Sequence, residues 1–141
     1  MTIGLDTKIL LLIAGLLLLG GLVLGVWKYR QMSASPTALA HPYVDIAHRA
    51  ALMYSFATLV LAALAEFSAF PTAVNLLAGS IVTLFFVAAI ATYVVHGFLG
   101  DTDNQFEHPV RGTDLFMWAL IVGEIGGTAV LLTGFVFGQF F

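Results

Sequence analysis

The side chains best suited to chemistry in this chain are four histidines. Imidazole is the commonest metal ligand in proteins, and its charge changes near neutral pH. The 141-residue chain contains no cysteine, so thiolate nucleophiles, disulfides and iron–sulfur ligation are excluded. The histidines stand beside the ends of long apolar stretches, and they are His41, His48, His96 and His108. Their placement indicates that the chemistry of the molecule is concentrated at one end.

Two of these histidines, His48 and His96, are expected to approach each other and Tyr93. His48 stands near the start of one apolar stretch and His96 at the end of the next, and antiparallel helices bring such positions to the same depth. Tyr93 lies one turn before His96 on the same helical face. Two imidazoles from different helices suit a haem iron or another transition metal. The alternative for His48 is an interfacial side chain that hydrogen-bonds to lipid headgroups or to Asp45.

Four further positions carry polar groups of interest. His41 and His108 each precede a proline and are expected in loops without a ligand role. Glu124 lies near the middle of the last apolar stretch, where an ionisable group is costly and therefore a candidate for function. The alternative is a neutral carboxyl hydrogen-bonded between packed helices. Tyr54 makes one side of the second stretch mildly polar and could line a pocket.

The composition indicates a membrane protein, because 60% of the residues are hydrophobic and only 9% are charged. Soluble domains carry roughly 25% charged residues. Each apolar stretch reaches the ~20 residues that a helix needs to cross a ~30 Å hydrocarbon core. The stretches are continuous, unlike the alternating ~10-residue segments of a membrane barrel. We therefore predict an all-α integral membrane four-helix bundle, a single domain over residues 1–141, with spans at about 9–27, 46–67, 74–95 and 115–137.

The cationic residues predict the orientation of the bundle. Four cationic residues lie in or beside the connections between spans one and two and between spans three and four, namely Lys28, Arg30, Arg49 and Arg111, whereas the opposite side has only Lys8 and the amino terminus. The positive-inside rule then places loops 28–45 and 97–112 in the cytoplasm and both termini outside. The expected location is the inner (cytoplasmic) membrane, as a multi-pass protein in the lipid bilayer.

Residues 38–40, Ala-Leu-Ala, look like the small-residue site where a signal peptide is cut. The preceding apolar run is longer than a signal h-region, and cleavage would place the basic loop outside, so we expect the first span to be retained. The connection 97–112 is long enough to fold back as a lid, although a solvated polar loop is equally expected. The net charge of −3 and the lack of a basic cluster argue against nucleic acid as a partner.

Several short motifs, in this order and spacing, resemble a known family. They are Ala47-His48 at the start of the second span, Gly79-Ser80-Ile81-Val82 leading to Tyr93, and Asn104-Gln105-Phe106 followed by Gly112, Asp114 and Phe116. With these residues the chain resembles the styrene oxide isomerase and hydroxylaminobenzene mutase family of small four-span membrane proteins. The likeness runs from roughly residue 40 to residue 138 and is weak in the first span.

The resemblance implies a homo-oligomer, a trimer with haem b at the subunit interfaces. His48 would ligate the ferric iron, and Tyr93 would orient a small hydrophobic substrate such as an epoxide or an arylhydroxylamine. The open face of the iron would act as a Lewis acid in a rearrangement without net redox change. The expected function is therefore a haem-b membrane isomerase.

Two departures from the isomerase pattern keep other functions open. Tyr54 stands where the isomerase has an asparagine, and His96 stands where it has a serine. His96 could hydrogen-bond a substrate, so that Tyr93, Tyr54 and His96 form the catalytic set. It could instead occupy the sixth iron position with His48, as in a non-enzymatic b-type cytochrome that transfers electrons. The third alternative is a haem-free accessory subunit of a membrane complex.

Overall fold

The computed structural model describes residues 2–141, and this part of the chain forms four α-helices. They are α1 (Leu5–Ala34), α2 (Pro42–Glu66), α3 (Thr72–Leu99) and α4 (Thr113–Phe140). Each helix is long and apolar enough to cross a membrane. The predicted all-α four-helix bundle is confirmed, and the four candidate spans indicate a multi-pass membrane protein.

The helices are longer than the spans predicted from hydropathy. α1 has 30 residues, α2 has 25, and α3 and α4 have 28 each. At about 1.5 Å per residue these helices are roughly 38 to 45 Å long, more than the ~30 Å of the hydrocarbon core. Hydropathy identifies only the part of each helix that suits the hydrocarbon core. Backbone hydrogen bonds extend the helix beyond this part into the interface between membrane and water. α3 therefore continues to Leu99, and the predicted connection 97–112 is shorter, covering residues 100–112.

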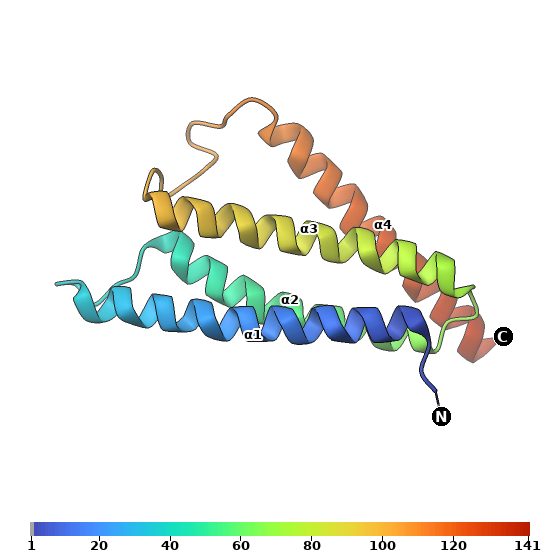
Figure 1. Cartoon of the computed structure of the whole chain (residues 1–141). Helices are drawn as coiled ribbons and strands as arrows, with labels where there is room; N and C mark the ends of the chain where they lie inside the picture. The colour runs from blue at the N-terminus through green and yellow to red at the C-terminus, as the bar shows by residue number, and fades with distance from the viewer. Residues whose placement is uncertain (1) are drawn as a thin grey trace.

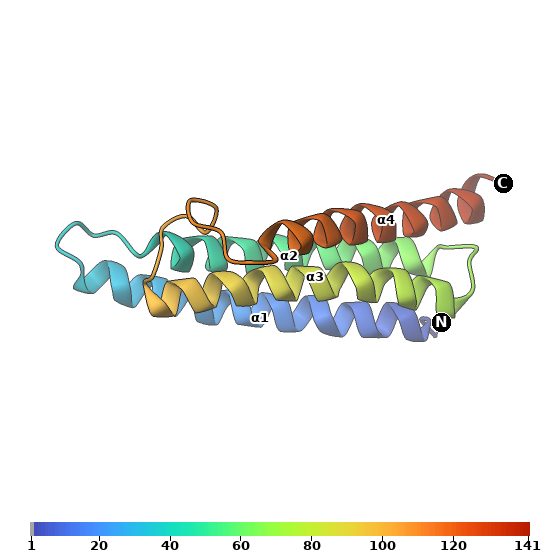
Figure 2. The same ribbon diagram turned by 90° about the horizontal axis from the view of Figure 1, so that it is seen from above.

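The helices run alternately up and down, so that both termini lie at the same end of the bundle (Figure 1). α1 packs on α2 and α3, and α4 packs on α3 and α2, while within residues 2–141 α1 and α4 make no contact. Viewed from above, α4 lies over α2 and α3 on the side away from α1 (Figure 2). α2 and α3 therefore form the middle layer.

Prolines and glycines set the helix ends nearest the connections. Pro42 begins α2, and the Nδ1 atom of His41 accepts a hydrogen bond of 3.2 Å from the Tyr43 amide. This side-chain cap satisfies one of the amides left unpaired at a helix start. Gly100 ends α3 with φ at 60°, and Gly112 precedes α4 with φ at 97°. Both glycines adopt the left-handed conformation that other residues avoid.

α1 packs closely on α2 through a Gly-xxx-Gly pair. A Cβ atom at Gly21 would lie 3.2 Å from the backbone nitrogen of Leu52, and one at Gly25 would lie 2.8 Å from Cε1 of His48. Small residues permit such approaches between membrane helices. The glycines thus bring α1 against the face of α2 that carries His48.

A polar network joins the start of α1 to the α2–α3 turn. The Asn75 side chain is 2% exposed and donates to Oδ2 of Asp6 at 3.1 Å. Glu66 accepts hydrogen bonds from the Thr7 hydroxyl at 2.7 Å and from the Gly4 amide at 3.1 Å. These contacts satisfy amides at the start of α1 and fix its end against the hairpin.

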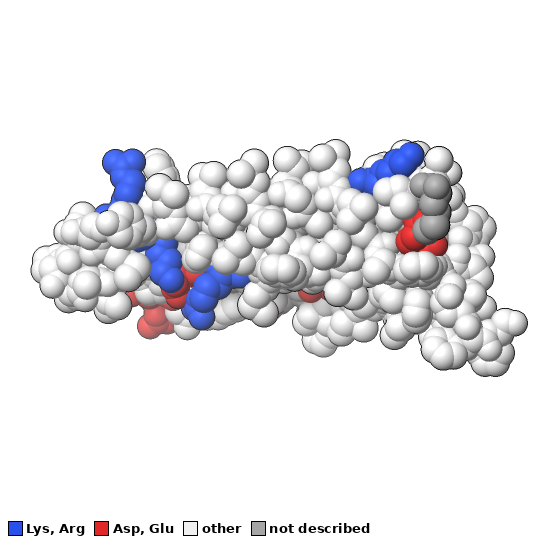
Figure 3. Space-filling view, turned by 90° about the horizontal axis from the view of Figure 1, so that it is seen from below, with Lys and Arg blue, Asp and Glu red and all other residues white. Residues whose placement is uncertain are grey.

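On the face shown in Figure 3, charged side chains form small groups toward the two ends, and most of the surface between them is uncharged. Many large apolar side chains of the helices are exposed, such as Leu12 at 63% and Trp118 at 66%. Exposed apolar side chains in such number are unfavourable in water and are suited to contact with acyl chains.

Candidate functional site

A cavity with a volume of about 610 Å³ lies between α2, α3, the first half of α4 and the connection 100–112. This volume is within the roughly 300–1,000 Å³ of small-molecule sites. Most of its lining is apolar. Its polar lining side chains include Tyr54, Thr92, Tyr93, His96, Asp101, Thr102, Gln105, His108, Arg111 and Thr113.

The cavity exists because α4 diverges from α3 toward its N-terminal end (Figure 1). In the second half of α4, a Cβ at Gly127 would lie 2.7 Å from the carbonyl oxygen of Ala78, so the helices touch there. The first turns of α4 lack such glycines and carry Phe116 and Leu120 instead. Larger side chains hold the helices apart, and both of these residues line the cavity.

Three residues predicted for catalysis, Tyr54, Tyr93 and His96, line this cavity together. The Tyr54 ring stacks on Phe86 of α3 with ring centroids 4.1 Å apart and planes 4° from parallel. Stacking in this way fixes a ring that comes from α2 at the surface of α3. Two helices thus supply hydroxyl groups to one space.

His96 is held in place at the wide end of the cavity. Its Nδ1 atom lies 2.9 Å from Oδ1 of Asp101, which follows the end of α3. This hydrogen bond holds the pKa of Asp101 below its usual range, because it stabilises the carboxylate. The Tyr43 ring lies against the same imidazole, with centroids 5.2 Å apart, and also stacks on Tyr93 at 5.9 Å.

The connection 100–112 folds back onto the helices, as the lid interpretation predicts. The Tyr43 hydroxyl accepts a hydrogen bond of 2.7 Å from the Gln105 amide. Nε2 of His41 lies 3.3 Å from Oδ1 of Asp103. We call residues 100–112 the lid, because they are tied to α2 and line the cavity through Gln105 and their neighbours.

His48 does not line this cavity, and its expected approach to Tyr93 and His96 is not seen. Its Nδ1 atom lies 2.8 Å from the carbonyl oxygen of Gly21, and its ring packs on Gly25, both in α1. The antiparallel arrangement of the helices determines the depth of a residue in the bundle. It does not determine how each helix is rotated about its own axis. Six residues separate His48 from Tyr54, which at about 100° per residue places them roughly 120° apart around α2.

The alternative in which His48 pairs with Asp45 is not seen either. Asp45 contacts Lys28 at 2.6 Å and Arg49 at 2.7 Å instead. These ion pairs link α1 and α2 near the start of α2. The His48 imidazole contacts the backbone of α1 and not Asp45.

The surroundings of His48 fit those of a metal ligand. A carbonyl oxygen only accepts, so Nδ1 of His48 must donate to Gly21, and in the neutral ring Nε2 then keeps its lone pair. Histidines that bind metals characteristically donate their other ring N–H to such an acceptor. Within residues 2–141 no three His, Cys, Asp or Glu side chains are grouped to hold a bare metal ion. A single imidazole of this kind suits a metal that brings its own equatorial ligands, as haem does.

Glu124 lies beyond the inner end of the cavity. It follows Leu120 by one helical turn on the same face of α4, and its Oε1 atom is buried without a hydrogen-bond partner. Its carboxyl lies within electrostatic range of the Tyr54 and Tyr93 hydroxyls. The alternative of a carboxyl hydrogen-bonded between helices is not seen.

Several residues of the site were not singled out from the sequence. Tyr43 and Asp101 organise the cavity's wide end, and His108, expected to be a loop residue without a role, lines it. Tyr43 is two residues after His41 at the start of α2, and an aromatic residue there is a weak signal. The contact with the lid depends on the path of the connection, which local pattern does not determine.

Comparisons of the chain with protein-family models, with curated proteins and with solved structures find no match. The resemblance to the isomerase family therefore stays a prediction.

Proposed function

We propose that the protein is a membrane isomerase that rearranges a small, largely apolar molecule with a reactive oxygen, such as an epoxide. The observation that carries this proposal is the meeting of Tyr54, Tyr93 and His96 in one mostly apolar cavity. Such a cavity excludes bulk water from an apolar substrate and offers a few polar groups to orient it. The bilayer would supply the substrate by partitioning.

The two tyrosines would act on the substrate oxygen. Their hydroxyls would donate hydrogen bonds to an epoxide oxygen and stabilise the negative charge that develops as a C–O bond breaks. Migration of a hydrogen within the substrate then gives an aldehyde, with no atom gained or lost. His96, fixed by Asp101, would present a polar group at the wide end of the cavity.

We propose haem b as the cofactor, with His48 as the ligand. When bound, ferric haem would supply a Lewis acid to the substrate oxygen. The chain's part is to hold the imidazole, and Gly21 and Gly25 do so through a hydrogen bond and a close contact. His48 and the cavity lie on different sides of α2, so the proposal includes a homo-oligomer, a trimer by resemblance. A haem held by one subunit would then serve the cavity of the next.

The proposed orientation in the inner membrane follows the positive-inside rule. Loops 28–45 and 97–112 would be cytoplasmic and both termini outside. The supporting observation is that both termini lie at one end of the bundle, with the lid and the α1–α2 connection at the other (Figure 1). Fusion of a cytoplasm-active reporter to either end would test this orientation.

The decisive experiment is an absorption and electron-paramagnetic spectrum of the purified protein. We expect a Soret band and high-spin iron that binds azide, and we expect His48→Ala to lose the haem while His108→Ala keeps it. Tyr93→Phe should retain haem and lower turnover of a styrene-type epoxide about a hundredfold, the usual effect of removing one oxyanion donor.

Other results would replace the proposal. Low-spin iron that resists azide and becomes high-spin in His96→Ala would indicate the paired-histidine cytochrome. A folded preparation without a Soret band would indicate the haem-free accessory subunit. To test the shared site, His48→Ala and Tyr93→Phe chains can be expressed together. Mixed oligomers should recover part of the activity, and none would be recovered if each chain works alone.

A further inference from the structure

One carboxyl in the membrane-spanning region is left without a partner by the rest of the structure. Oε1 of Glu124 is buried and makes no hydrogen bond. Three other carboxyls are engaged: Asp45 with Lys28 and Arg49, Asp101 with His96, and Glu66 with Thr7. Glu124 differs from them because its buried oxygen is left for a group from outside the chain.

The position of Glu124 directs it toward the middle layer and the cavity. Its neighbour Gly123 packs on Phe85 and Ile81 of α3, and Gly127 packs on Val82. The face of α4 that carries these glycines also carries Leu120, which lines the cavity one turn above. Glu124 thus lies one helical turn beyond Leu120, next to a cavity whose lining includes aromatic side chains.

The charged and titratable groups around Glu124 offer no permanent cation. Tyr54 faces it from α2 and Tyr93 from α3, and α1 does not contact α4. At the wide end, His96 is paired with Asp101, and His108 lines the wall. Asp114, on α4 itself, is a further acid.

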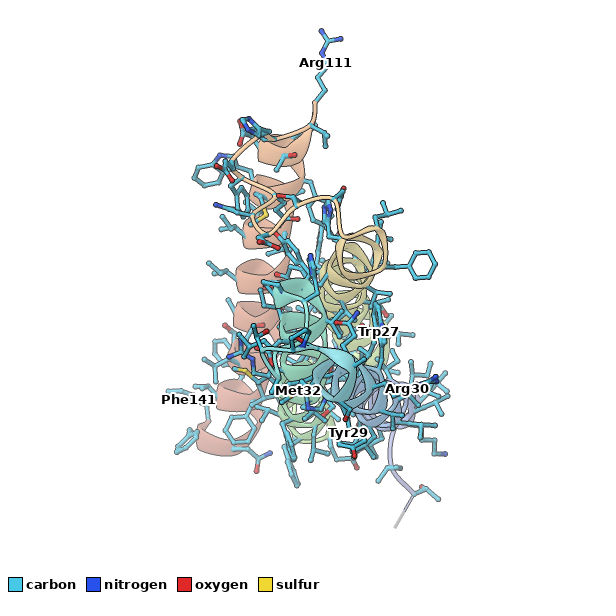
Figure 4. The ribbon with its side chains drawn as sticks, turned by 90° about the vertical axis from the view of Figure 1, so that its left-hand side faces the viewer. Trp27, Tyr29, Arg30, Met32, Arg111 and Phe141 are labelled. Atoms are coloured by element: carbon cyan, nitrogen blue, oxygen red, sulfur yellow. The ribbon has the colours of Figure 1, made fainter. Side chains whose placement is uncertain are left out.

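Arg111 also belongs to this end of the cavity, but its side chain extends away from the helices (Figure 4). Among residues 2–141, the ion pairs formed by lysine and arginine side chains all involve Asp45. The cavity therefore offers aromatic side chains beside Glu124, and the one arginine of its lining extends outward.

We propose that the inner end of this cavity binds a lipophilic organic cation in exchange for a proton on Glu124. A bare carboxylate is costly within a membrane, so the empty site holds the neutral acid. A cation that enters takes the place of the proton: the O–H bond of Glu124 breaks, the proton leaves to water, and the carboxylate pairs with the cation. Charge is balanced in both states.

The walls of the cavity suit such a ligand. Tyr54, Tyr93 and Phe116 all line it, and the electron-rich faces of aromatic rings attract cations within about 6 Å. An apolar cation also partitions into the bilayer, which raises its concentration around the protein. This inference goes beyond the proposed isomerase and does not require haem, although a cation in the cavity would compete with its substrate.

The test is equilibrium dialysis of tetraphenylphosphonium against the full-length protein in detergent micelles, with protein-free micelles subtracted. We expect binding that tightens as pH rises, by at most about tenfold per pH unit, because one proton is released per cation. The released proton is measured directly in weakly buffered solution. Glu124→Gln should abolish binding, and Glu107→Gln, which removes an exposed lid carboxyl, should not.

Three outcomes would overturn the inference. They are no binding above that of micelles, binding by Glu124→Gln equal to the wild type, or binding without proton release. Where the glutamine variant fails to fold, proton release that persists in a protein carrying both His96→Ala and His108→Ala assigns the proton to Glu124, and its loss would overturn the inference. A pH dependence that persists in Glu124→Gln would come from His96 or His108 and would also count against Glu124. The isomerase proposal is tested separately by the haem spectrum. Its failure would not affect the test of cation binding at Glu124.

Discussion

Replacing Gly25 by alanine tests whether α1 positions the proposed haem ligand. A Cβ at residue 25 would lie 2.8 Å from Cε1 and 3.1 Å from Nδ1 of His48. Both distances are shorter than an ordinary van der Waals contact, so the imidazole must move. The same ring holds its hydrogen bond to the Gly21 carbonyl at 2.8 Å, and a shift of several tenths of an ångström lengthens or breaks it.

The size of the effect follows from the lost hydrogen bond. A hydrogen bond of this kind contributes roughly 0.5–1.5 kcal/mol to stability, so the four-helix fold should survive. Loss of the partner that orients a metal-binding histidine typically weakens metal binding by about 10- to 100-fold. We therefore expect Gly25→Ala to weaken haem binding by this factor, with a much smaller change in thermal unfolding.

The assay is titration of haem into the protein freed of haem, followed at the Soret band. Gly20→Ala is the matched control, because it makes the same change on the same helix and nothing lies within 4 Å of the added Cβ. Equal haem affinity for the Gly25→Ala and Gly20→Ala proteins would refute the idea that the close contact with Gly25 positions His48. Circular dichroism on both variants separates a local effect from a loss of fold.

Three other predictions concern packing, the lid and pH. Gly127→Ala should destabilise the protein by about 1–3 kcal/mol, because the added methyl group overpacks the α3–α4 contact, while Gly126→Ala, with open space around it, should change thermal unfolding little. Tyr43→Phe removes the acceptor for the lid amide but keeps the ring, so limited proteolysis should cut residues 100–112 faster while the helices stay intact. The lowered pKa of Asp101 means that its contact with His96 stabilises the fold above the ordinary carboxyl range and loses this effect as pH falls through the lowered pKa. NMR titration of His96→Ala should return the Asp101 pKa to its usual range, and an unchanged pKa would contradict the assigned cause.

The number and type of the helices could be predicted from sequence because hydropathy reports directly on the transfer of side chains to lipid. The precise ends could not, because they depend on capping. His41 caps α2 with its side chain, and Gly100 ends α3 in the left-handed conformation. The polar network of Asn75 and Asp6 was also missed, because it joins residues 69 positions apart.

The candidate site could be predicted only in part, for a geometric reason. Depth follows from topology, and Tyr93 and His96 do line one cavity together with Tyr54. His48, which the same reasoning predicts beside them, does not line it. The rotation of each helix about its axis is set by packing partners, and the glycines of α1 turn His48 toward Gly21. A single sequence does not show which neighbour will contact which face of α2.

The placement of glycine along α4 explains why a cavity forms at one end of the bundle rather than a packed core. Gly127 and Gly134 are buried, and a Cβ at Gly138 would lie 2.5 Å from the carbonyl oxygen of Phe67, so the C-terminal half of α4 packs directly on its neighbours. The first turns of α4 carry Phe116, which lines the cavity, in place of such contacts. α4 packs tightly at its C-terminal end, and large side chains keep its N-terminal end away from α3. The two helices therefore diverge toward the N-terminal end of α4. The diverging end is the one that the lid covers, so the polar residues of the lid and the hydroxyls of the middle layer meet across the same space.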